Sequence, residues 1–256
     1  MNQKSKNFCF CTLAFNPPYR KMSKDLARDL EKYAPGIRIV IGTDEVKDFK
    51  DCPNVISYHQ KQQGILHCYN DKRFVFEFAL SRFDMAIFID ADTRFNEPIP
   101  REIDDFSGIQ GVHKNLIGHI TKYRPDRLSV VKKVAEKLKI NLDDVSYFGE
   151  SILMVSNQDS QAKIFLENWG KIGRYLELNG IHSGEGITIG IAAFQAGWQP
   201  KKSRDWETLN RIAQHIDAST IVKKTAWEKL QRRLGYHYRL NKERLLALKD
   251  FDFYYS

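Results

Sequence analysis

Met85-Ala86-Ile87-Phe88-Ile89-Asp90-Ala91-Asp92-Thr93-Arg94-Phe95 is a short apolar run that ends at two carboxylates one residue apart. Such a run, rich in Ile and Phe, is typical of a strand buried on both faces, although its periodicity also fits a buried helix. In an open α/β sheet, ligands bind beyond the carboxyl ends of the strands, so Asp90 and Asp92 are expected at the functional edge. Two carboxylates this close repel each other unless a cation lies between them, and a divalent metal is the simplest such cation.

The overall composition is that of a folded α/β protein. The chain has 256 residues, of which 42% are hydrophobic and 28% charged, so we expect one large domain with an ample core. The apolar run Phe8–Phe15 is too short for a signal peptide, and no stretch approaches the ~20 apolar residues that span a bilayer. The four cysteines show no zinc-ligand spacing, which favours a reduced, cytoplasmic compartment.

The chain carries a net charge of +8, from 40 Lys and Arg against 32 Asp and Glu. This excess predicts attraction to an anionic partner, which could be nucleic acid, a membrane surface or the phosphates of a nucleotide. Basic residues gather near the C-terminus, between Lys223 and Arg244. A run of charge is also compatible with an ordinary solvated helix face.

The N-terminal part has a β-α-β pattern. We expect a first strand over Phe8–Phe15 that ends at Asn16-Pro17-Pro18, a helix from Ser23 to Tyr33, and a second strand over Ile37–Ile41 that leads into Gly42-Thr43-Asp44. This form suits the binding of a mononucleotide. The absence of Gly-x-Gly-x-x-Gly argues against a dinucleotide site. Residues 45–70 are expected to be irregular, and a buried helix over 71–83, with Asp71 as its cap, should precede the central strand.

The second half should contribute further strands and helices to the same sheet. We expect strands over 106–112 and 148–156, helices over 126–139 and 158–178, and a basic amphipathic helix that passes through Leu234. Glu185 lies between Gly184 and Gly186 and opens an apolar segment. Its carboxylate is therefore predicted at the positive end of a helix, where it could equally be a simple surface cap.

One enzymatic use of Asp-x-Asp after a buried strand is the phosphatase reaction of the haloacid dehalogenase type. That motif has Thr four residues after the first Asp, whereas here Thr93 comes three residues on and Arg94 holds the required position. It also normally follows the first strand, and Asp90 lies far along the chain. We keep this class only as an alternative.

The second use is found in GT-A glycosyltransferases, which the chain resembles loosely over residues 8–200. The resemblance is most specific at Phe88-Ile89-Asp90-Ala91-Asp92-Thr93 with Lys72-Arg73 upstream, and there it is most similar to the retaining glycogenin and lipopolysaccharide galactosyltransferase family. Ile181-His182-Ser183-Gly184-Glu185 is weakly similar to the His-x-Glu region of the blood-group transferases. The family's C-terminal His-x-x-Gly-x-x-Lys-Pro-Trp is not intact, and His215, Lys223-Lys224 and Trp227 form at best a stretched version of it.

The resemblance implies a mixed, mostly parallel α/β sheet in one domain over 1–256. It implies a nucleotide-binding half (8–95), an acceptor-binding half (96–205) and a basic helical segment (206–256). It also implies transfer of a sugar, with retention favoured, from a nucleotide donor to a glycan, a lipid-linked or a small-molecule acceptor, and a UDP-linked donor is favoured. A soluble, cytoplasmic enzyme with peripheral membrane contact through the basic segment is expected, and no specific nucleic acid.

Metal and donor ligands follow from the same resemblance. Mn²⁺ or Mg²⁺ would be bound by Asp90, Asp92 and His215, since such ions prefer hard oxygen ligands and accept imidazole. Asp90 could instead hold donor hydroxyls. His215 could instead be a structural hydrogen-bonding group, with His182 and His237 as competing ligands. The expected donor-binding residues are Thr12, Ala14, Tyr19, Thr43, Asp44, Lys72, Arg73, Lys223 and Lys224.

Catalysis is assigned to Glu185, which would face the reacting anomeric carbon, with Glu150 as the alternative. Glu185 could stabilise the transition state or act as the nucleophile in a retaining reaction, or take the proton of the acceptor in an inverting one. Arg73 could instead pair with Glu77 one helical turn on. The rival from another class is a basic protein that binds nucleic acid or membrane through its C-terminal segment and has no catalytic activity.

Overall fold

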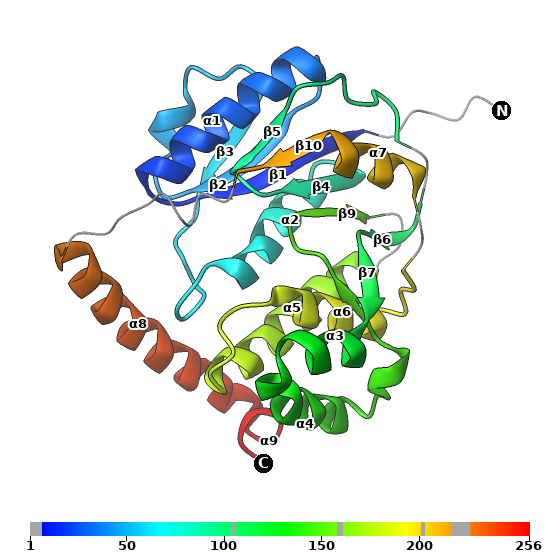
Figure 1. The fold of residues 1–256 in the computed structure, drawn as a ribbon. Helices are drawn as coiled ribbons and strands as arrows, with labels where there is room; N and C mark the ends of the chain where they lie inside the picture. The colour runs from blue at the N-terminus through cyan, green and yellow to red at the C-terminus, as the bar shows by residue number, and fades with distance from the viewer. Residues whose placement is uncertain (1–6, 104–105, 158–160, 201–202, 217–225) are drawn as a thin grey trace.

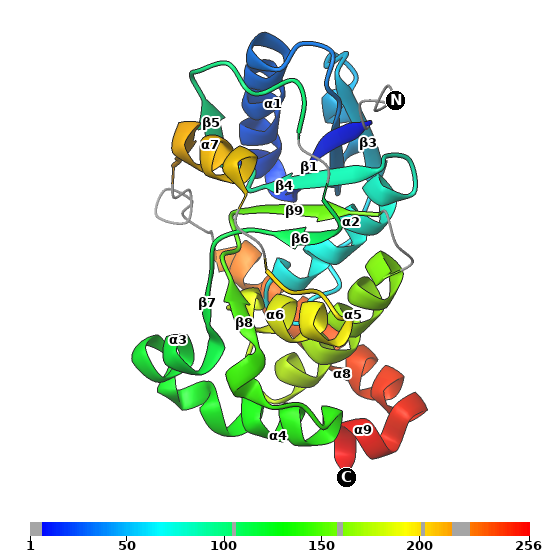
Figure 2. The same ribbon diagram turned by 90° about the vertical axis from the view of Figure 1, so that its right-hand side faces the viewer.

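The computed structural model describes residues 7–103, 106–157, 161–200, 203–216 and 226–256, with side chains from 230 onward in the last range. At its centre lies a six-stranded sheet with the order β3-β2-β1-β4-β9-β6 (Figures 1 and 2). Its strands are β1 (Phe8–Ala14), β2 (Ile39–Thr43), β3 (Val55–His59), β4 (Met85–Ile89), β6 (Gly108–Gln110) and β9 (Ile152–Ser156). Neighbouring strands from β3 to β4 run parallel, and β9 is antiparallel to both β4 and β6.

Helices cover both faces of this sheet, which gives the predicted mixed, mostly parallel α/β architecture. One face packs against α1 (Asn16–Tyr33) and α7 (Arg204–Ile212), and the other against α2 (Lys72–Leu80), α5 (Gln161–Leu178) and α6 (Glu185–Gln195). Further helices are α3 (Leu116–Tyr123), α4 (Leu128–Leu138), α8 (Ala226–Ala247) and α9 (Phe251–Tyr255), with short 3₁₀ turns at Val46–Phe49, Tyr69–Asp71, Pro125–Arg127, Leu142–Asp144 and Leu248–Asp250.

Strand β4 is buried on both faces, as the apolar run predicts. Ala86 and Phe88 belong to the core beneath α2 and α5, whereas Ile87 and Ile89 belong to the core beneath α1. Because side chains alternate along a strand, the next even position, Asp90, is expected on the α2 side. Asp90 is therefore expected at the carboxyl edge of the sheet, on the face that α2 covers.

Helix α1 begins earlier than predicted, at Asn16 rather than near Ser23. Pro17 and Pro18 occupy its first turn, where the backbone needs no N–H donor and a fixed φ suits the helix. Ser23 is buried inside the helix and is not its cap. The predicted helix start at Ser23 was therefore wrong, because a proline pair ends a strand and starts a helix equally well.

Other boundaries also differ. The second strand spans Ile39–Thr43 instead of residues 37–41, and β3 forms in a region predicted to be irregular. The strand predicted over 106–112 is shorter, since β6 spans only Gly108–Gln110, and the strand predicted over 148–156 divides into β8 (Ser146–Phe148) and β9. Strand β8 leaves the main sheet and pairs with β7 (His113–Asn115) as a separate antiparallel ribbon. Asp71 does not cap α2 with its side chain; its carboxylate accepts the backbone N–H groups of Gln63 and Gly64 at 2.8 and 3.0 Å.

Candidate functional site

Lys72 is the centre of a buried polar cluster at the carboxyl edge of the sheet. Its Nζ lies 3.0 Å from Asp90 Oδ1 and 2.8 Å from Glu185 Oε1, and it donates to the backbone carbonyl of Glu150 at 2.9 Å. The side chains of Lys72 and Glu185 are only 7% and 2% exposed. An ammonium has three protons, and these contacts account for all of them, so Lys72 holds the two carboxylates in place rather than offering a free cation to a phosphate.

Local structure explains why these groups meet. Asp90 follows β4 on the same face as Phe88, and the ammonium of Lys72 lies 4.7 Å from the centre of the Phe88 ring. Glu185 is the first residue of α6, where its negative charge is favourable at the positive end of the helix. Burial alone would lower the pKa of Lys72, but Asp90 and Glu185 outweigh it and raise that pKa above its ordinary value.

Glu150 and Glu185 form a second, closely coupled pair. The carboxyl of Glu150 accepts the N–H of Gly186 at 2.8 Å and contacts the hydroxyl of Tyr147 at 3.0 Å. Burial and the adjacent Glu185 raise the pKa of Glu150 to about 8. Burial opposes ionisation of Glu185 as well, but Lys72 and a hydrogen bond from Glu150 lower its pKa. At neutral pH the proton of this pair therefore belongs to Glu150, and Glu185 is the carboxylate.

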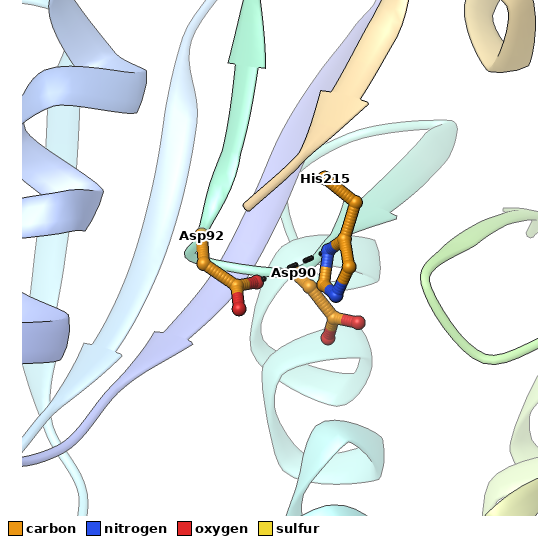
Figure 3. Close-up of side chains that lie close together, drawn as sticks. All are labelled: Asp90, Asp92 and His215. Atoms are coloured by element: carbon orange, nitrogen blue, oxygen red, sulfur yellow. Dashed lines mark ion pairs between the residues drawn. The ribbon is translucent and has the colours of Figure 1, made fainter. Parts of the chain in front are cut away.

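Asp92 lies next to His215 and close to Asp90, at the carboxyl edge of the sheet (Figure 3). The distance from Asp92 Oδ1 to His215 Nδ1 is 3.3 Å. The two meet because β5 (Thr93–Phe95) pairs antiparallel with β10 (Ala213–His215), which sets His215 opposite Thr93. The N–H of Ile216 also donates to the backbone carbonyl of Asp92 at 3.0 Å.

Asp90, Asp92 and His215 are placed so that one cation could contact all three. Each offers a ligand atom, and these atoms lie within 4.8 Å of one another. Two carboxylate oxygens and one imidazole nitrogen form a donor set suited to a divalent ion such as Mn²⁺ or Mg²⁺. The residues present therefore fit the expected metal.

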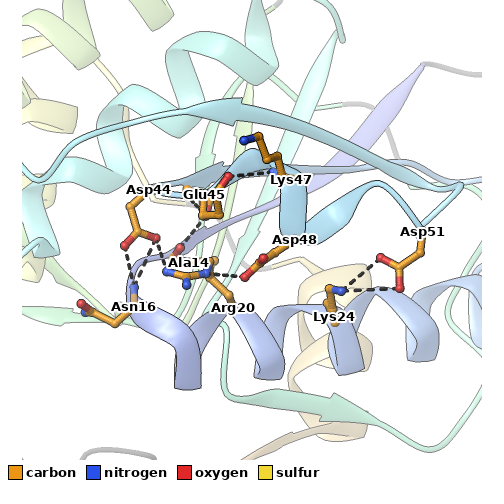
Figure 4. Close-up of polar contacts among 10 residues, drawn as sticks. Ala14, Asn16, Arg20, Lys24, Asp44, Glu45, Lys47, Asp48 and Asp51 are labelled. Atoms are coloured by element: carbon orange, nitrogen blue, oxygen red, sulfur yellow. Dashed lines mark hydrogen bonds and ion pairs between the residues drawn. The ribbon is translucent and has the colours of Figure 1, made fainter.

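The ends of β1 and β2 carry the other expected donor-binding residues (Figure 4). Thr43 donates its hydroxyl to the carbonyl of Ala14 at 2.8 Å. The carboxylate of Asp44 accepts from the Asn16 N–H at 3.2 Å and from Arg20 Nη1 at 2.7 Å. These contacts tie the start of α1 to the end of β2.

Thr12 and Tyr19 lie at the same end of β1. The hydroxyl of Thr12 is buried and has no hydrogen-bond partner among the described residues. Tyr19 is half-buried in the first turns of α1 and lies close enough to influence Tyr69 electrostatically. At this edge of the sheet, hydrogen bonds fix the backbone around Asp44, and the Thr12 hydroxyl has no hydrogen-bond partner in the described ranges.

Arg73 is not brought to the Lys72 cluster. Its guanidinium packs against Gly170 of α5 and over the ring of Phe74. It lines a separate small pocket together with Arg174 and Glu177. Lys223 and Lys224 lie outside the described residues.

A cleft of about 180 Å³ lies beside Glu150 and was not predicted from the sequence. It is lined by His119, Ile120, Arg124, Arg127, Tyr147, Glu150, Ser183, Gly184 and Ile187. These residues come from α3 and the turn that follows it, from β8 and the loop after it, and from the start of α6 and the loop before it. The one local signal was Tyr147, which lies three residues before Glu150, contacts its carboxyl and lines the cleft.

No protein-family model matches the sequence, and no curated protein sequence matches it. Solved structures with the same fold do match. A structure of the galactosyltransferase LgtC in complex with donor and acceptor sugar analogues superposes with a TM-score of 0.52 at 11% identity, covering 76% of this chain and 73% of that one. A structure of an active-site mutant of LgtC superposes with a TM-score of 0.50 at 12% identity, covering 81% of this chain and 86% of that one. The chain therefore has the GT-A fold of these glycosyltransferases.

Proposed function

We propose that the chain is a metal-dependent glycosyltransferase that transfers a sugar from a nucleotide donor, with a UDP-sugar as the favoured donor. The Asp90–Asp92–His215 group at the carboxyl edge of the sheet carries the proposal, because it lies where folds of this class bind ligands. It also lies beside a buried carboxylate, Glu185, held by Lys72.

The reaction breaks the bond between the anomeric carbon and the diphosphate oxygen, and the electron pair leaves with the diphosphate. A new bond forms between an acceptor hydroxyl oxygen and the anomeric carbon, and the hydroxyl proton passes to the departing diphosphate. A divalent ion bound at Asp90, Asp92 and His215 would stabilise the charge on the departing diphosphate. The buried hydroxyl of Thr12 and the frame around Asp44 supply a place for the nucleoside.

Glu185 is the proposed catalytic carboxylate. Its lowered pKa keeps it ionised at neutral pH, which suits a group that stabilises positive charge at the anomeric carbon or attacks it in a retaining reaction. Glu150 keeps its proton and bonds to Glu185. In this scheme Lys72 positions both Glu185 and Asp90, and Glu150 is the neighbouring proton carrier.

Thermal unfolding provides the first test. UDP with Mn²⁺ should raise the melting temperature, whereas UDP alone or Mn²⁺ alone should have little effect, because the ligand stabilises the folded state only where it binds. A donor-hydrolysis screen over UDP-, GDP- and CMP-sugars with Mn²⁺ then identifies the nucleotide. If none of UDP, GDP and CMP shifts the melting temperature in the presence of metal, the proposal fails.

We also propose that α8 contacts an anionic membrane surface. Leu230, Leu234, Tyr238, Leu245 and Leu248 recur at helical spacing on one side of this helix and its 3₁₀ extension, and they are 46–71% exposed. Arg233 and Arg244 flank this apolar stripe. An exposed apolar face with basic borders is the pattern of an interfacial helix. No helix in the described ranges is long and apolar enough to cross a membrane.

The salt dependence of polyanion binding and the Mn²⁺ dependence of UDP binding distinguish the enzyme from the alternative, a basic binding protein without catalytic activity. A polyanion-binding protein should bind RNA or DNA with strong salt dependence and ignore Mn²⁺. The enzyme should show the opposite behaviour, with metal-dependent UDP binding and no preference for nucleic acid.

A further inference from the structure

The cleft beside Glu150 has the position of a second substrate site. It reaches both the carboxyl of Glu150 and the Gly184 turn that begins α6, so it lies next to the proposed catalytic Glu185. Its volume of about 180 Å³ is below the ~300–1,000 Å³ of sites for drug-sized ligands. It therefore suits a single sugar unit or another small group. This inference rests on the proposed glycosyltransferase function.

Arg127 places a positive charge in the wall of this cleft. The residue is only 4% exposed, and its guanidinium donates to the carbonyl of Ser183 at 2.6 Å and to the Ser183 hydroxyl at 2.8 Å. Both acceptors are neutral, and Arg127 forms no ion pair with any carboxylate in the described part of the chain. A largely buried cation without a counter-ion is unfavourable, so an anion bound in the cleft would be stabilised there.

Gly184 packs tightly against the guanidinium of Arg127. Its φ of +78° is a left-handed conformation, and a Cβ at this position would overlap Nη1 of Arg127. The guanidinium is therefore packed directly against the turn that precedes Glu185.

The remaining charges in the cleft do not neutralise Arg127. Arg124 adds a second cation, and its own partner, Asp126, is 63% exposed. Burial, followed by the charge of Arg124, lowers the pKa of Arg127, and the opposing charge of Asp126 offsets this only in part. Glu150 is the one carboxyl that lines the cleft, among the residues described, and with a pKa of about 8 it is mostly protonated at neutral pH. The cleft is therefore net positive.

An aromatic wall faces these charges. The rings of His119 and Tyr147 stack with their centres 3.6 Å apart and their planes at 12°. His119 Nδ1 is buried and has no hydrogen-bond partner among the described residues. Burial, followed by the charge of Lys114, lowers the pKa of His119. The stacked rings form a flat aromatic wall of the cleft, which suits packing against a sugar ring.

We propose that this cleft binds the acceptor, and that the acceptor unit it takes is an anionic sugar, whose carboxylate or phosphate is bound by Arg124 and Arg127 while its ring packs on His119 and Tyr147. Neutral sugars would lack the group that compensates the buried guanidinium.

Binding of small sugars in metal-free buffer at constant ionic strength tests this inference. Glucuronate and glucose 6-phosphate should bind more tightly than glucose, by about tenfold for one charge-assisted hydrogen bond. The two anions separate a carboxylate from a phosphate preference. Arg124→Gln, at a half-exposed position that should not affect folding, should remove most of this preference, and Arg127→Gln should remove it further.

Arg82→Gln is the matched control, because Arg82 is exposed and precedes β4 at the opposite edge of the sheet. It should leave the preference unchanged. Equal binding of glucose and both anions, no anion binding at about 50 mM, or a preference that survives Arg124→Gln would overturn the proposal. The shift in melting temperature with UDP and Mn²⁺, measured on the same variants, reports separately on the donor site and so distinguishes failure here from failure of the proposed function.

Discussion

Replacement of Lys72 by methionine should remove the cation that holds Asp90 and Glu185 while filling most of its volume. In the folded protein both carboxylates would then face each other without the ammonium that now lies 3.0 and 2.8 Å from them. The apolar contact of the side-chain stem with Phe88 would be largely kept. The effect of the substitution therefore reports on charge rather than on packing.

The expected cost follows from burial. Lys72 and Glu185 are almost fully buried, and removing one partner of a buried pair costs about 3–5 kcal/mol. The side chain of Asp90 is 28% exposed and keeps some water, so the lower end, about 3 kcal/mol, is appropriate. For a protein of this size that corresponds to a fall in melting temperature of roughly 6–12 °C.

The loss should also depend on pH. Without Lys72, burial raises the pKa of both carboxyls in the folded state above their unfolded values. A carboxyl of this kind stabilises the folded state when protonated, and that stability is lost as the pH rises through the interval between the two pKa values. The difference between Lys72→Met and the parent chain should therefore be larger at pH 8 than at pH 5.

Urea denaturation followed by circular dichroism at both pH values measures this difference. Lys163→Met is the control, since Lys163 is 83% exposed and lies 3.9 Å from Glu167, and it should change stability by less than about 0.5 kcal/mol. A loss below about 1 kcal/mol at pH 8, or an equal loss at both pH values, would refute the assignment of Lys72 as the buried counter-ion.

Further predictions concern the metal, the proton, the turn and the membrane. Asp92→Asn should abolish the Mn²⁺-dependent stabilisation by UDP while leaving the fold intact, and an unchanged shift would rule out Asp92 as a ligand. Glu150→Gln should gain stability relative to the parent chain as the pH rises from about 5 to about 8, because the parent must keep a proton on Glu150 (pKa about 8) to stay folded; parallel curves in urea denaturation would contradict this. Gly184→Ala should cost about 1–3 kcal/mol through strain and overlap with Arg127, and a melting temperature equal to that of the parent would count against it. Leu234→Glu should reduce co-sedimentation with anionic vesicles, whereas undiminished binding would exclude the α8 stripe as the contact.

The elements that could be predicted from sequence are those set by local signals. The run Met85–Ile89 predicts a buried strand without reference to any other part of the chain, and Asp90 and Asp92 follow it directly. Glu185 could be placed at the start of a helix because Gly184 breaks the preceding segment and an apolar run follows. Each inference uses only a few neighbouring residues, and each of these features is present in the structure.

The parts that were missed depend on pairing over long distances. Glu150 was predicted on a continuous strand, whereas the chain leaves β8 before it and enters β9 after it. Arg127 and Ser183 are hydrogen-bonded although they lie 56 residues apart in the sequence, and no local pattern encodes such a contact. His215 was proposed beside Asp92 from the resemblance alone, and the physical reason, the pairing of β10 with β5, was not visible in the sequence.

The close spacing of Asp90 and Asp92 suggested a metal because two carboxylates repel, but the structure gives each of them a different neighbour. Lys72 contacts Asp90, and His215 contacts Asp92, so their repulsion alone does not require an ion. The charge of the whole cluster is the stronger argument for the proposed cation. Asp90, Asp92 and Glu185 bring three carboxylates, and Lys72 is the one ammonium bound to them among the described residues. With the proton of the Glu150–Glu185 pair on Glu150, the three carboxylates and Lys72 sum to two negative charges, which is the charge that a divalent ion would balance. Asp92→Asn should therefore weaken metal binding, because it removes one of these negative charges.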